Sequence, residues 1–293
     1  IPYWDLAQGY LVNVDEAIRT VWSGESIAPD EDILIEEGWN FIAYYPSFEL
    51  DAGAPDFYVL SPVIDNVIIA KDEMGRFLSP EFGFSNMLPW RESEGYQIRV
   101  DADVVLNYPA EREGLASAPL PSKVDIQSHW EALCSTGENM SLLVTLNPGS
   151  GDQVAAFNSE NWLVGVGTVD GCGRCGLAVW GDDDLTDAVD GLIKGEIFTL
   201  KFWSSTLNTE VDLEPDVSGL VYETDGFAII SATILPTIPD QYYLSQNYPN
   251  PFNSTTILPY GLPETSQLSI SIYDMSGRLV EILVNGNIEA GYH

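Results

Sequence analysis

The sequence contains few of the residues on which enzyme chemistry most often depends. Only two of its 293 residues are histidines, His129 and His293, so His129 alone is left for acid–base or metal chemistry inside the chain. Neither a GxSxG nor an HExxH motif is present. Because a nucleophile needs a neighbouring base, we expect a protein that is not an enzyme.

Basic residues are also scarce. Eleven Lys and Arg stand against 45 Asp and Glu, which gives a formal net charge of −34. Nucleic acids and anionic membranes attract clusters of Lys and Arg, so neither is an expected partner. No run approaches the about 18 consecutive apolar residues of a membrane-spanning helix. Because 45% of the residues are hydrophobic and 11% aromatic, we expect a folded protein with an acidic surface.

The three cysteines are Cys134, Cys172 and Cys175. We expect a disulfide from Cys134 to Cys172 or to Cys175, with one thiol left free, because such bonds form in oxidising exteriors. Two alternatives use the same residues: a zinc site of three cysteines with His129, and a redox pair at Cys172 and Cys175. The first lacks paired, closely spaced ligands, and the second lacks a βαβ context.

An internal repeat relates residues 4–15 to residues 90–101. Five pairs are identical in one constant register: Trp4 and Trp90, Gly9 and Gly95, Tyr10 and Tyr96, Val14 and Val100, and Asp15 and Asp101. The matched tryptophans predict core packing. The second copy closes a unit that begins near Asp32, whereas the first copy has no such beginning. Since no Met or signal segment stands at Ile1, we expect a processed chain, or part of a longer one, that opens in a truncated repeat.

The periodicity is that of strands. Apolar or alternating runs bounded by turn residues predict strands at 39–45, 67–70, 96–100, 140–146, 154–157, 162–169, 177–180, 197–203, 227–233 and 268–273. Residues 57–64 are the one place for a short helix. With 25 Gly and 18 Pro spread between short strands, we expect a mainly β protein of serial antiparallel β-sandwich modules, immunoglobulin-like in fold.

Two proline-containing stretches divide the chain. Pro119 and Pro121 lie in a connector at 111–123, and residues 235–251 hold four more prolines, which favour an extended linker. We therefore predict four parts: the tail of a truncated repeat at 1–30, a β repeat module at 31–117, a middle β-sandwich domain at 118–235, and a linker with an incomplete C-terminal domain at 236–293.

The last part carries the most specific motif. Its opening heptapeptide consists of Asn247, Tyr248, Pro249, Asn250, Pro251, Phe252 and Asn253. An Ile272-Tyr273-Asp274 strand end, a Gly277-Arg278 turn and an Ala-Gly-Tyr-His close at 290–293 follow in order. This segment closely resembles the type A C-terminal sorting domain of proteins that use the type IX secretion system of Bacteroidota and related bacteria. The resemblance implies export across the outer membrane, followed by release or attachment at the cell surface.

The chain departs from that family at its end, because the family's domains run a few strands beyond the point where this sequence stops. Two interpretations remain open. The sequence is cut there, or another chain supplies the missing strand by β-augmentation, which would also cover an otherwise exposed sheet edge.

The two inner parts resemble modules common in large secreted proteins of the same bacteria. The resemblance lies in Gly38-Trp39-Asn40 with 64–72 for the first, and in Trp180-Gly181-Asp182-Asp183 for the second. It implies no particular activity.

An acidic loop between Gly181 and Gly191 is a second candidate metal site. It contains Asp182, Asp183, Asp184, Asp187 and Asp190. Calcium binds six to eight oxygens in flexible geometry, so these carboxylates suit a calcium ion, although their spacing is not that of an EF-hand. A solvated hairpin tip is the alternative. No other cofactor is expected.

Residues 171–176 form a GxGxxG pattern, which in dinucleotide-binding proteins joins a strand to a helix. Here the strand-like run 177–180 follows, so we interpret the pattern as a glycine-rich hairpin.

Taken together, these features favour an extracellular structural or adhesive protein of the outer cell surface, with no catalytic residues. Its expected partners are the type IX secretion machinery and copies of itself, assembled into fibres by strand exchange. The alternative is a non-catalytic accessory region, of the carbohydrate-binding kind, in a larger secreted hydrolase.

Overall fold

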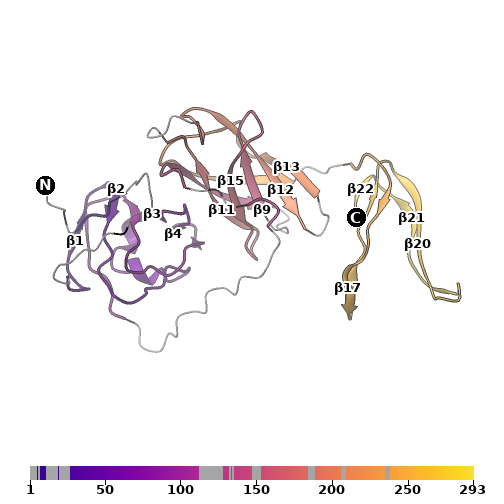
Figure 1. Ribbon diagram of the computed structural model, residues 1–293, viewed down its shortest axis with the longest axis horizontal. Coiled ribbons are helices and arrows are strands. Elements are labelled where there is room, and N and C mark those ends of the chain that lie inside the picture. The colour runs from indigo at the N-terminus through magenta and orange to yellow at the C-terminus, as the bar shows by residue number, and fades with distance from the viewer. Residues whose placement is uncertain are drawn as a thin grey trace.

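The computed structural model describes residues 5, 7–10, 19, 27–111, 128–131, 133, 135–146, 153–183, 189–205, 209–234 and 238–293. Of these residues 47% lie in strands and 3% in helical turns, so the prediction of a mainly β protein is confirmed. Figure 1 shows three groups of strands that follow one another along the long axis. We call them the first module (β1–β7), the barrel (β8–β15) and the C-terminal segment (β16–β22).

The first module is built on a five-stranded antiparallel sheet with the order β2-β6-β3-β4-β5, and β1 pairs separately with β7. Its strands are β1 (Ile33–Ile35), β2 (Gly38–Ile42), β3 (Val67–Asp72), β4 (Phe77–Ser79), β5 (Phe84–Ser85), β6 (Tyr96–Val100) and β7 (Val104–Leu106). In place of the predicted short helix there are two 3₁₀ turns, η1 (Tyr58–Leu60) and η2 (Ile64–Asn66).

Aromatic side chains fill the core of the first module. Trp90 is fully buried and stacks on Tyr96, with ring centroids 3.9 Å apart and an interplanar angle of 4°. Tyr44 and Tyr108 approach the same indole edge-on, at 6.3 and 6.5 Å. The predicted core role of the repeated tryptophan is therefore confirmed for Trp90, whereas Trp4 lies outside the described residues.

The first repeat copy contacts the first module at the outer edge of β2. Gln8 forms an antiparallel bridge with Ile42, and the Gly9 N–H donates to the Phe41 carbonyl oxygen at 3.1 Å. A Cβ at Gly9 would lie 2.9 Å from the Ile42 carbonyl oxygen, so the glycine permits this close pairing. Residues 7–10 thus cover part of an otherwise unpaired strand edge.

The middle strands close into a seven-stranded barrel with the order β13-β15-β8-β11-β10-β9-β12. The strands are β8 (Asn139–Leu146), β9 (Gln153–Phe157), β10 (Leu163–Thr168), β11 (Arg174–Trp180), β12 (Ile197–Ser204), β13 (Thr209–Pro215), β14 (Leu220–Val221) and β15 (Phe227–Ile234). Pairing of β12 with β13 completes the ring, and β14 pairs with the start of β12. The β15–β8 pair is parallel.

This closure corrects the predicted β-sandwich for the middle domain. Alternating strands and turn residues are common to sandwiches and barrels, so the local pattern does not separate them. The difference lies in β12, whose residues 201–203 pair with β9 on one side and with β13 on the other. Gly165 permits the curvature, because a Cβ there would lie 2.4 Å from the Ala178 carbonyl oxygen of the neighbouring strand.

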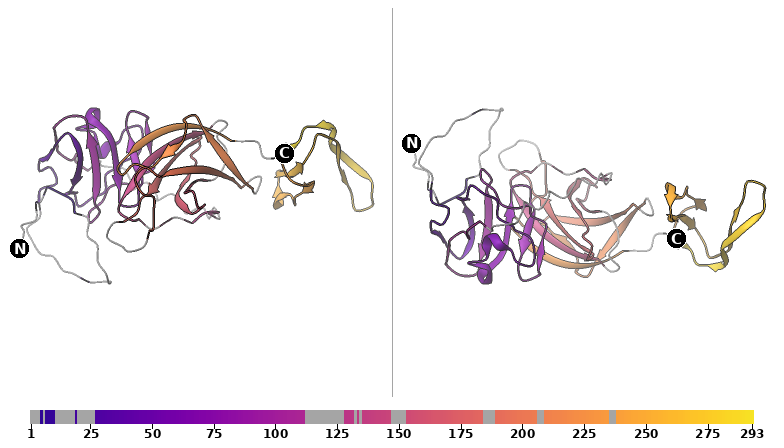
Figure 2. Two further views of the ribbon diagram at one scale, coloured as in Figure 1. Left: turned by 90° about the horizontal axis from the view of Figure 1, so that it is seen from above. Right: turned by 90° about the horizontal axis from the view of Figure 1, so that it is seen from below.

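The C-terminal segment consists of three small sheets: β16-β19-β22, β17-β18 and β20-β21. The strands are β16 (Tyr243–Leu244), β17 (Tyr248–Asn253), β18 (Thr255–Ile257), β19 (Tyr260–Leu262), β20 (Ser266–Tyr273), β21 (Leu279–Ile288) and β22 (Gly291–Tyr292). Figure 2 shows the long β20–β21 hairpin extending away from the barrel.

Three hairpin tips share the sequence Asp-x-x-Gly-Arg: Asp72–Arg76, Asp170–Arg174 and Asp274–Arg278. In each, one carboxylate oxygen accepts the N–H groups of residues two and four positions later, and the other accepts the Arg Nε–H. The glycine takes a left-handed conformation, with φ between 74° and 78°. The same five-residue device therefore ends one hairpin in each group of strands.

Candidate functional site

The first module and the barrel meet at a shared apolar cluster. Its buried members are Ile69, Phe77, Phe84 and Leu143, and Trp39, Ile68 and Phe227 pack against them. Phe77 of β4 meets Phe227 of β15 edge-on, with centroids 5.8 Å apart. The aromatic side chains of two distant segments thus form one core at the junction.

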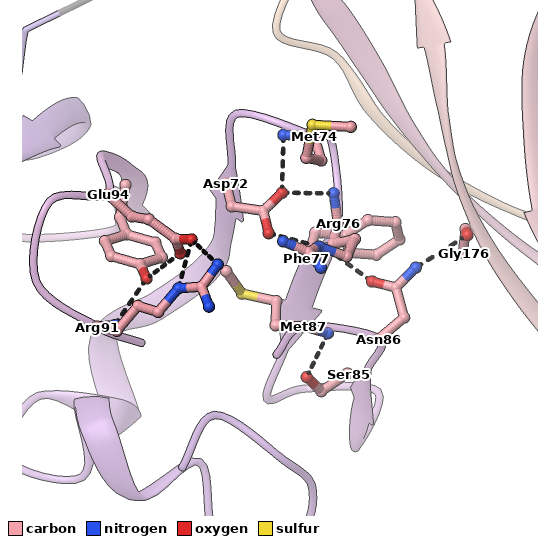
Figure 3. A network of polar contacts seen from close by, with 11 residues as sticks. Asp72, Met74, Arg76, Phe77, Ser85, Asn86, Met87, Arg91, Glu94 and Gly176 are labelled. Atoms are coloured by element: carbon pink, nitrogen blue, oxygen red, sulfur yellow. Dashed lines mark hydrogen bonds and ion pairs between the residues drawn. The ribbon is translucent and has the colours of Figure 1, made fainter. Parts of the chain in front are cut away.

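Hydrogen bonds from side chains of one part to the backbone of the other reinforce this junction. The Asn86 Oδ1 accepts the Phe77 N–H at 2.8 Å, while the Asn86 Nδ2 donates to the Gly176 carbonyl oxygen of β11 at 3.0 Å (Figure 3). A Cβ at Gly176 would lie 2.5 Å from the Phe84 ring, so glycine is needed for the close approach. In the opposite direction, Arg174 donates to the Gly83 carbonyl oxygen at 3.1 Å.

Lys71 is the charged residue at the centre of the junction. Its side chain is 2% exposed, and Nζ lies 2.6 Å from the Asp225 Oδ1. Nζ also donates to the Asn139 Oδ1 at 3.4 Å and lies over the Trp39 ring, 4.8 Å from its centroid. Burial lowers the pKa of the Lys71 ammonium, although Asp225 favours the charged form. An amine, an amide and a carboxylate therefore converge between the two parts.

Nothing in the sequence pattern singles out these three residues. Lys71 directly follows the apolar run 67–70, and a lysine at that position is equally typical of a solvated strand end. Asn139 and Asp225 stand 68 and 154 residues away from it. A lysine directly after four apolar residues, in a chain with only 11 basic residues, is the one signal that could have drawn attention to it.

The acidic loop is closed by the backbone at its base. Gly181 forms a parallel bridge with Leu192, and a Cβ at Gly191 would lie 2.1 Å from the Gly181 carbonyl oxygen. The Asp182 Oδ1 accepts the Asp190 N–H at 3.0 Å, and the Asp190 Oδ1 accepts the Asp183 N–H at 3.3 Å.

Two members of the proposed calcium set, Asp184 and Asp187, lie outside the described residues. In the part of the chain that the structure describes, no three acidic, His or Cys side chains converge as metal ligands would. Calcium binding by Asp182, Asp183, Asp184, Asp187 and Asp190 stays a prediction.

The described cysteines differ in environment. Cys172 is exposed at the tip of the 170–174 hairpin, and Cys175 is buried inside the barrel; both carry free thiols. Cys134 itself lies outside the described residues, but because both of its predicted partners carry free thiols, the predicted disulfide to Cys172 or Cys175 is not formed in this structure. The GxGxxG pattern forms a hairpin tip followed by strand β11, as predicted.

His129 lies against the outside of the barrel wall. Its ring stacks on Trp203, with centroids 3.6 Å apart and an interplanar angle of 4°, and Nε2 lies 2.7 Å from the Glu210 Oε1. The Trp130 ring meets the imidazole edge-on, with centroids 5.0 Å apart, and the Gln153 Oε1 accepts the backbone N–H groups of His129 and of Trp130. This arrangement holds the 128–131 segment on β9, β12 and β13.

The predicted sorting motif forms strand β17, which pairs with β18 through Tyr248 and Ile257 and through Asn253 and Thr255. Tyr248 is 77% exposed and Phe252 56%. The Asn247 Nδ2 donates to the Thr256 Oγ1 at 3.0 Å. The motif therefore presents its large side chains to solvent.

The C-terminal segment as a whole leaves its apolar side chains exposed. On the β20–β21 hairpin these are Ile272, Tyr273, Met275, Leu279, Val280, Ile282 and Leu283. A groove of about 600 Å³ lies between this hairpin and the β16–β19 strands, lined by Tyr243, Tyr260, Leu268 and Ile270 among others.

Within the described residues, no helix is both long enough and apolar enough to span a membrane. No protein-family model, curated protein or solved structure matches this chain.

Proposed function

We propose that this chain is an extracellular structural or adhesive protein of the cell surface, exported by the type IX secretion system. The observation that carries the proposal is the motif at 247–253, which resembles the opening of a type A sorting domain and lies on an exposed hairpin. A sorting signal has to be reached by the export machinery, and the 77% exposure of Tyr248 suits that requirement.

The junction of the first module and the barrel supports a structural role. A shared apolar cluster, an ion pair between buried Lys71 and partly exposed Asp225, and contacts from side chains to the backbone of the other part hold the two together. Such a junction resists relative movement of the two parts, which is what a surface protein under load requires.

The C-terminal segment supports assembly of copies by strand exchange. Apolar side chains along β20 and β21 are exposed, and in the described residues these two strands pair only with each other. A strand from a second copy would pair with an open edge of this sheet and extend it, and contact between the two copies would shield part of the exposed apolar surface.

The export proposal is tested with the full chain placed behind a signal peptide in a bacterium that has a type IX system. We expect the chain on the cell surface or in the medium, and a Tyr248→Ser, Phe252→Ser variant retained in the periplasm. Trp162→Ser, which changes an exposed aromatic side chain outside the motif, is the matched control. Equal export of the motif variant and the control would refute the proposal.

The assembly proposal is tested by sedimentation of the full chain over a range of concentrations. We expect self-association that Val280→Glu weakens and that Val217→Glu, a comparably exposed site on the barrel, leaves unchanged. A monomer at every concentration would exclude strand exchange between copies.

One observation favours the second candidate, a carbohydrate-binding accessory region. Trp162, at the turn between β9 and β10, is 58% exposed, and an exposed indole can stack on a sugar ring. We expect the Trp162→Ala variant to lose glycan binding if this candidate holds. Absence of glycan binding by the unaltered chain would exclude it.

A further inference from the structure

Lys71, Asn139 and Asp225 come from β3, from the start of β8 and from the turn before β15, and their side chains meet where the first module contacts the barrel. Their side chains bring together an amine, a carboxamide and a carboxylate. A salt bridge alone needs the amine and the carboxylate only. The amide is the additional feature, and it lies at the first module's contact with the barrel.

The surroundings favour a nucleophilic amine. Lys71 is 2% exposed and has the face of Trp39 beside Nζ, so water has little access to the ammonium group. Burial lowers the pKa of this group and so increases its neutral fraction. A neutral amine held beside a carbonyl is the reactant that amide formation requires.

Asn139 is held in place for attack. Its side chain is 4% exposed, and the Asn139 Oδ1 lies 3.4 Å from the Lys71 Nζ. Asn139 pairs with Trp180 in the β8–β11 ladder, so its backbone position is set by the barrel itself. Proximity of this kind replaces a bimolecular encounter with an intramolecular one.

Asp225 is placed to transfer the proton. Its Oδ1 lies 2.6 Å from the Lys71 Nζ, and its N–H donates to the Asn139 carbonyl oxygen at 3.0 Å. Both reactants are thus tied to the same residue. The Asp225 side chain is 42% exposed, and an ionised carboxylate resists attack by an amine, so Asp225 suits proton transfer better than bond formation.

We propose that Lys71 and Asn139 form an intramolecular isopeptide bond that joins the first module covalently to the barrel. Asp225 takes a proton from the Lys71 ammonium, and the neutral Nζ attacks the Asn139 Cγ. Asp225 returns this proton to Nδ2 as the Cγ–Nδ2 bond breaks and ammonia departs. It then takes the second proton, which Nζ must lose to become an amide nitrogen, and passes it to the ammonia, which leaves as ammonium. One amide is consumed and one is formed, so the step needs no oxidant, reductant or co-reactant.

The bond would bypass the chain between Lys71 and Asn139, so that pulling on the protein could not separate the first module from the barrel. This inference does not depend on the export proposal, because the three residues lie outside the sorting motif. It adds a covalent basis to the structural role.

The test is the intact mass of the purified full chain. We expect a mass lower than that of the sequence by one ammonia. Trypsin digestion of the denatured protein should leave Lys71 uncleaved and yield residues 20–76 joined to residues 124–174, because Lys71 and Asn139 lie in those two peptides.

Two variants remove the reaction while keeping the fold. Lys71→Arg keeps the positive charge but has no primary amine, and Asp225→Asn suits the left-handed backbone at this position (φ 57°) but cannot transfer the proton. Both should show the full mass of their sequences. Lys194→Arg changes an exposed lysine and should still lose one ammonia.

Circular dichroism and thermal melting confirm that each variant is folded. A folded, unaltered chain that keeps its full mass after prolonged incubation would overturn the proposal. A loss of one water, with Lys71 joined to Asp225, would overturn the assignment of Asn139. Loss of ammonia in the folded Asp225→Asn variant would overturn the proton-transfer role.

Discussion

Trp90 shows how one residue organises the first module. It is fully buried, stacks on Tyr96 and meets Tyr44 and Tyr108 edge-on. Trp90→Ala would remove these contacts and leave a cavity, so we expect a loss of about 3–5 kcal/mol in unfolding free energy, measured by denaturant titration. Trp162→Ala, at an exposed site, should stay within about 0.5 kcal/mol of the unaltered chain. Equal effects would contradict the core role of Trp90.

Cys175 makes the barrel sensitive to alkali. Burial raises the pKa of this thiol from its usual 9.0 to about 12. The unfolded chain releases the thiol proton near pH 9, whereas the folded chain keeps it until about pH 12. The folded state therefore becomes less stable relative to the unfolded state as the pH rises above 9. The loss contributed by this group approaches about 1.4 kcal/mol per pH unit.

We therefore expect Cys175→Ala to reduce the fall in unfolding free energy between pH 9 and 10, measured by denaturant titration at each pH. Cys172→Ala, at the exposed cysteine, is the control and should leave the fall in unfolding free energy between pH 9 and 10 unchanged. If the unfolding free energy of the Cys175→Ala variant falls as steeply as that of the unaltered chain, the Cys175 thiol does not cause the loss of stability at alkaline pH.

At the scale of elements, the Asp-x-x-Gly-Arg hairpin tip occurs three times with the same hydrogen bonds, but its surroundings differ. Asp72 is buried, and burial outweighs the contacts with Arg76 and raises the pKa of its carboxyl. Asp274 is only half-buried, and the Arg278 N–H lowers the pKa of its carboxyl. The tip forms independently of burial because its partners are all local.

Gly75 and Gly277 offer a matched pair for measuring how packing against neighbouring residues affects the stability of the hairpin tip. Both have φ near 76°, where an alanine costs about 1–2 kcal/mol. A Cβ at Gly75 would lie 2.3 Å from the Ala178 Cβ, whereas a Cβ at Gly277 would meet nothing within 4 Å. We expect Gly75→Ala to cost about 1–3 kcal/mol more than Gly277→Ala.

Hydrogen exchange measures each opening free energy, because the Asp72 and Asp274 N–H groups both donate across their own hairpin tips. Similar protection losses in the two variants would mean that the first tip does not pack tightly on the barrel.

Strand positions followed from local pattern more reliably than strand partners. The runs 96–100 and 140–146 match β6 and β8 closely. β13 was missed, although Val211 and Leu213 alternate with Glu210 and Asp212, because four of its seven residues are polar or acidic. Its inward-facing residues are buried only because β12 and β15 enclose them.

For the whole molecule, the charge of −34 raises the question of bound cations. If the acidic loop binds calcium as predicted, the ion stabilises the folded state, by about 2.7 kcal/mol at 100 times its Kd. We expect calcium to raise the melting temperature and a chelator to lower it.

An Asp182→Asn, Asp190→Asn variant should lose this response, because asparagine keeps an oxygen for the loop N–H groups but removes the negative charge. Asp240→Asn, in the C-terminal segment, is the control for net charge. A melting temperature that does not respond to calcium would rule out the calcium site.

The amino-acid sequence by itself determined the β class, most strand positions, the buried role of Trp90 and the acidic surface, because each depends on side-chain chemistry and short-range periodicity. Only the tertiary structure decided that the middle strands close into a barrel, and that Lys71, Asn139 and Asp225 meet. The physical reason is the same for both. Pairing of β12 with β9 and of β15 with β8, and the packing of the first module on the barrel, join residues far apart in the chain, and no local pattern encodes which edges meet.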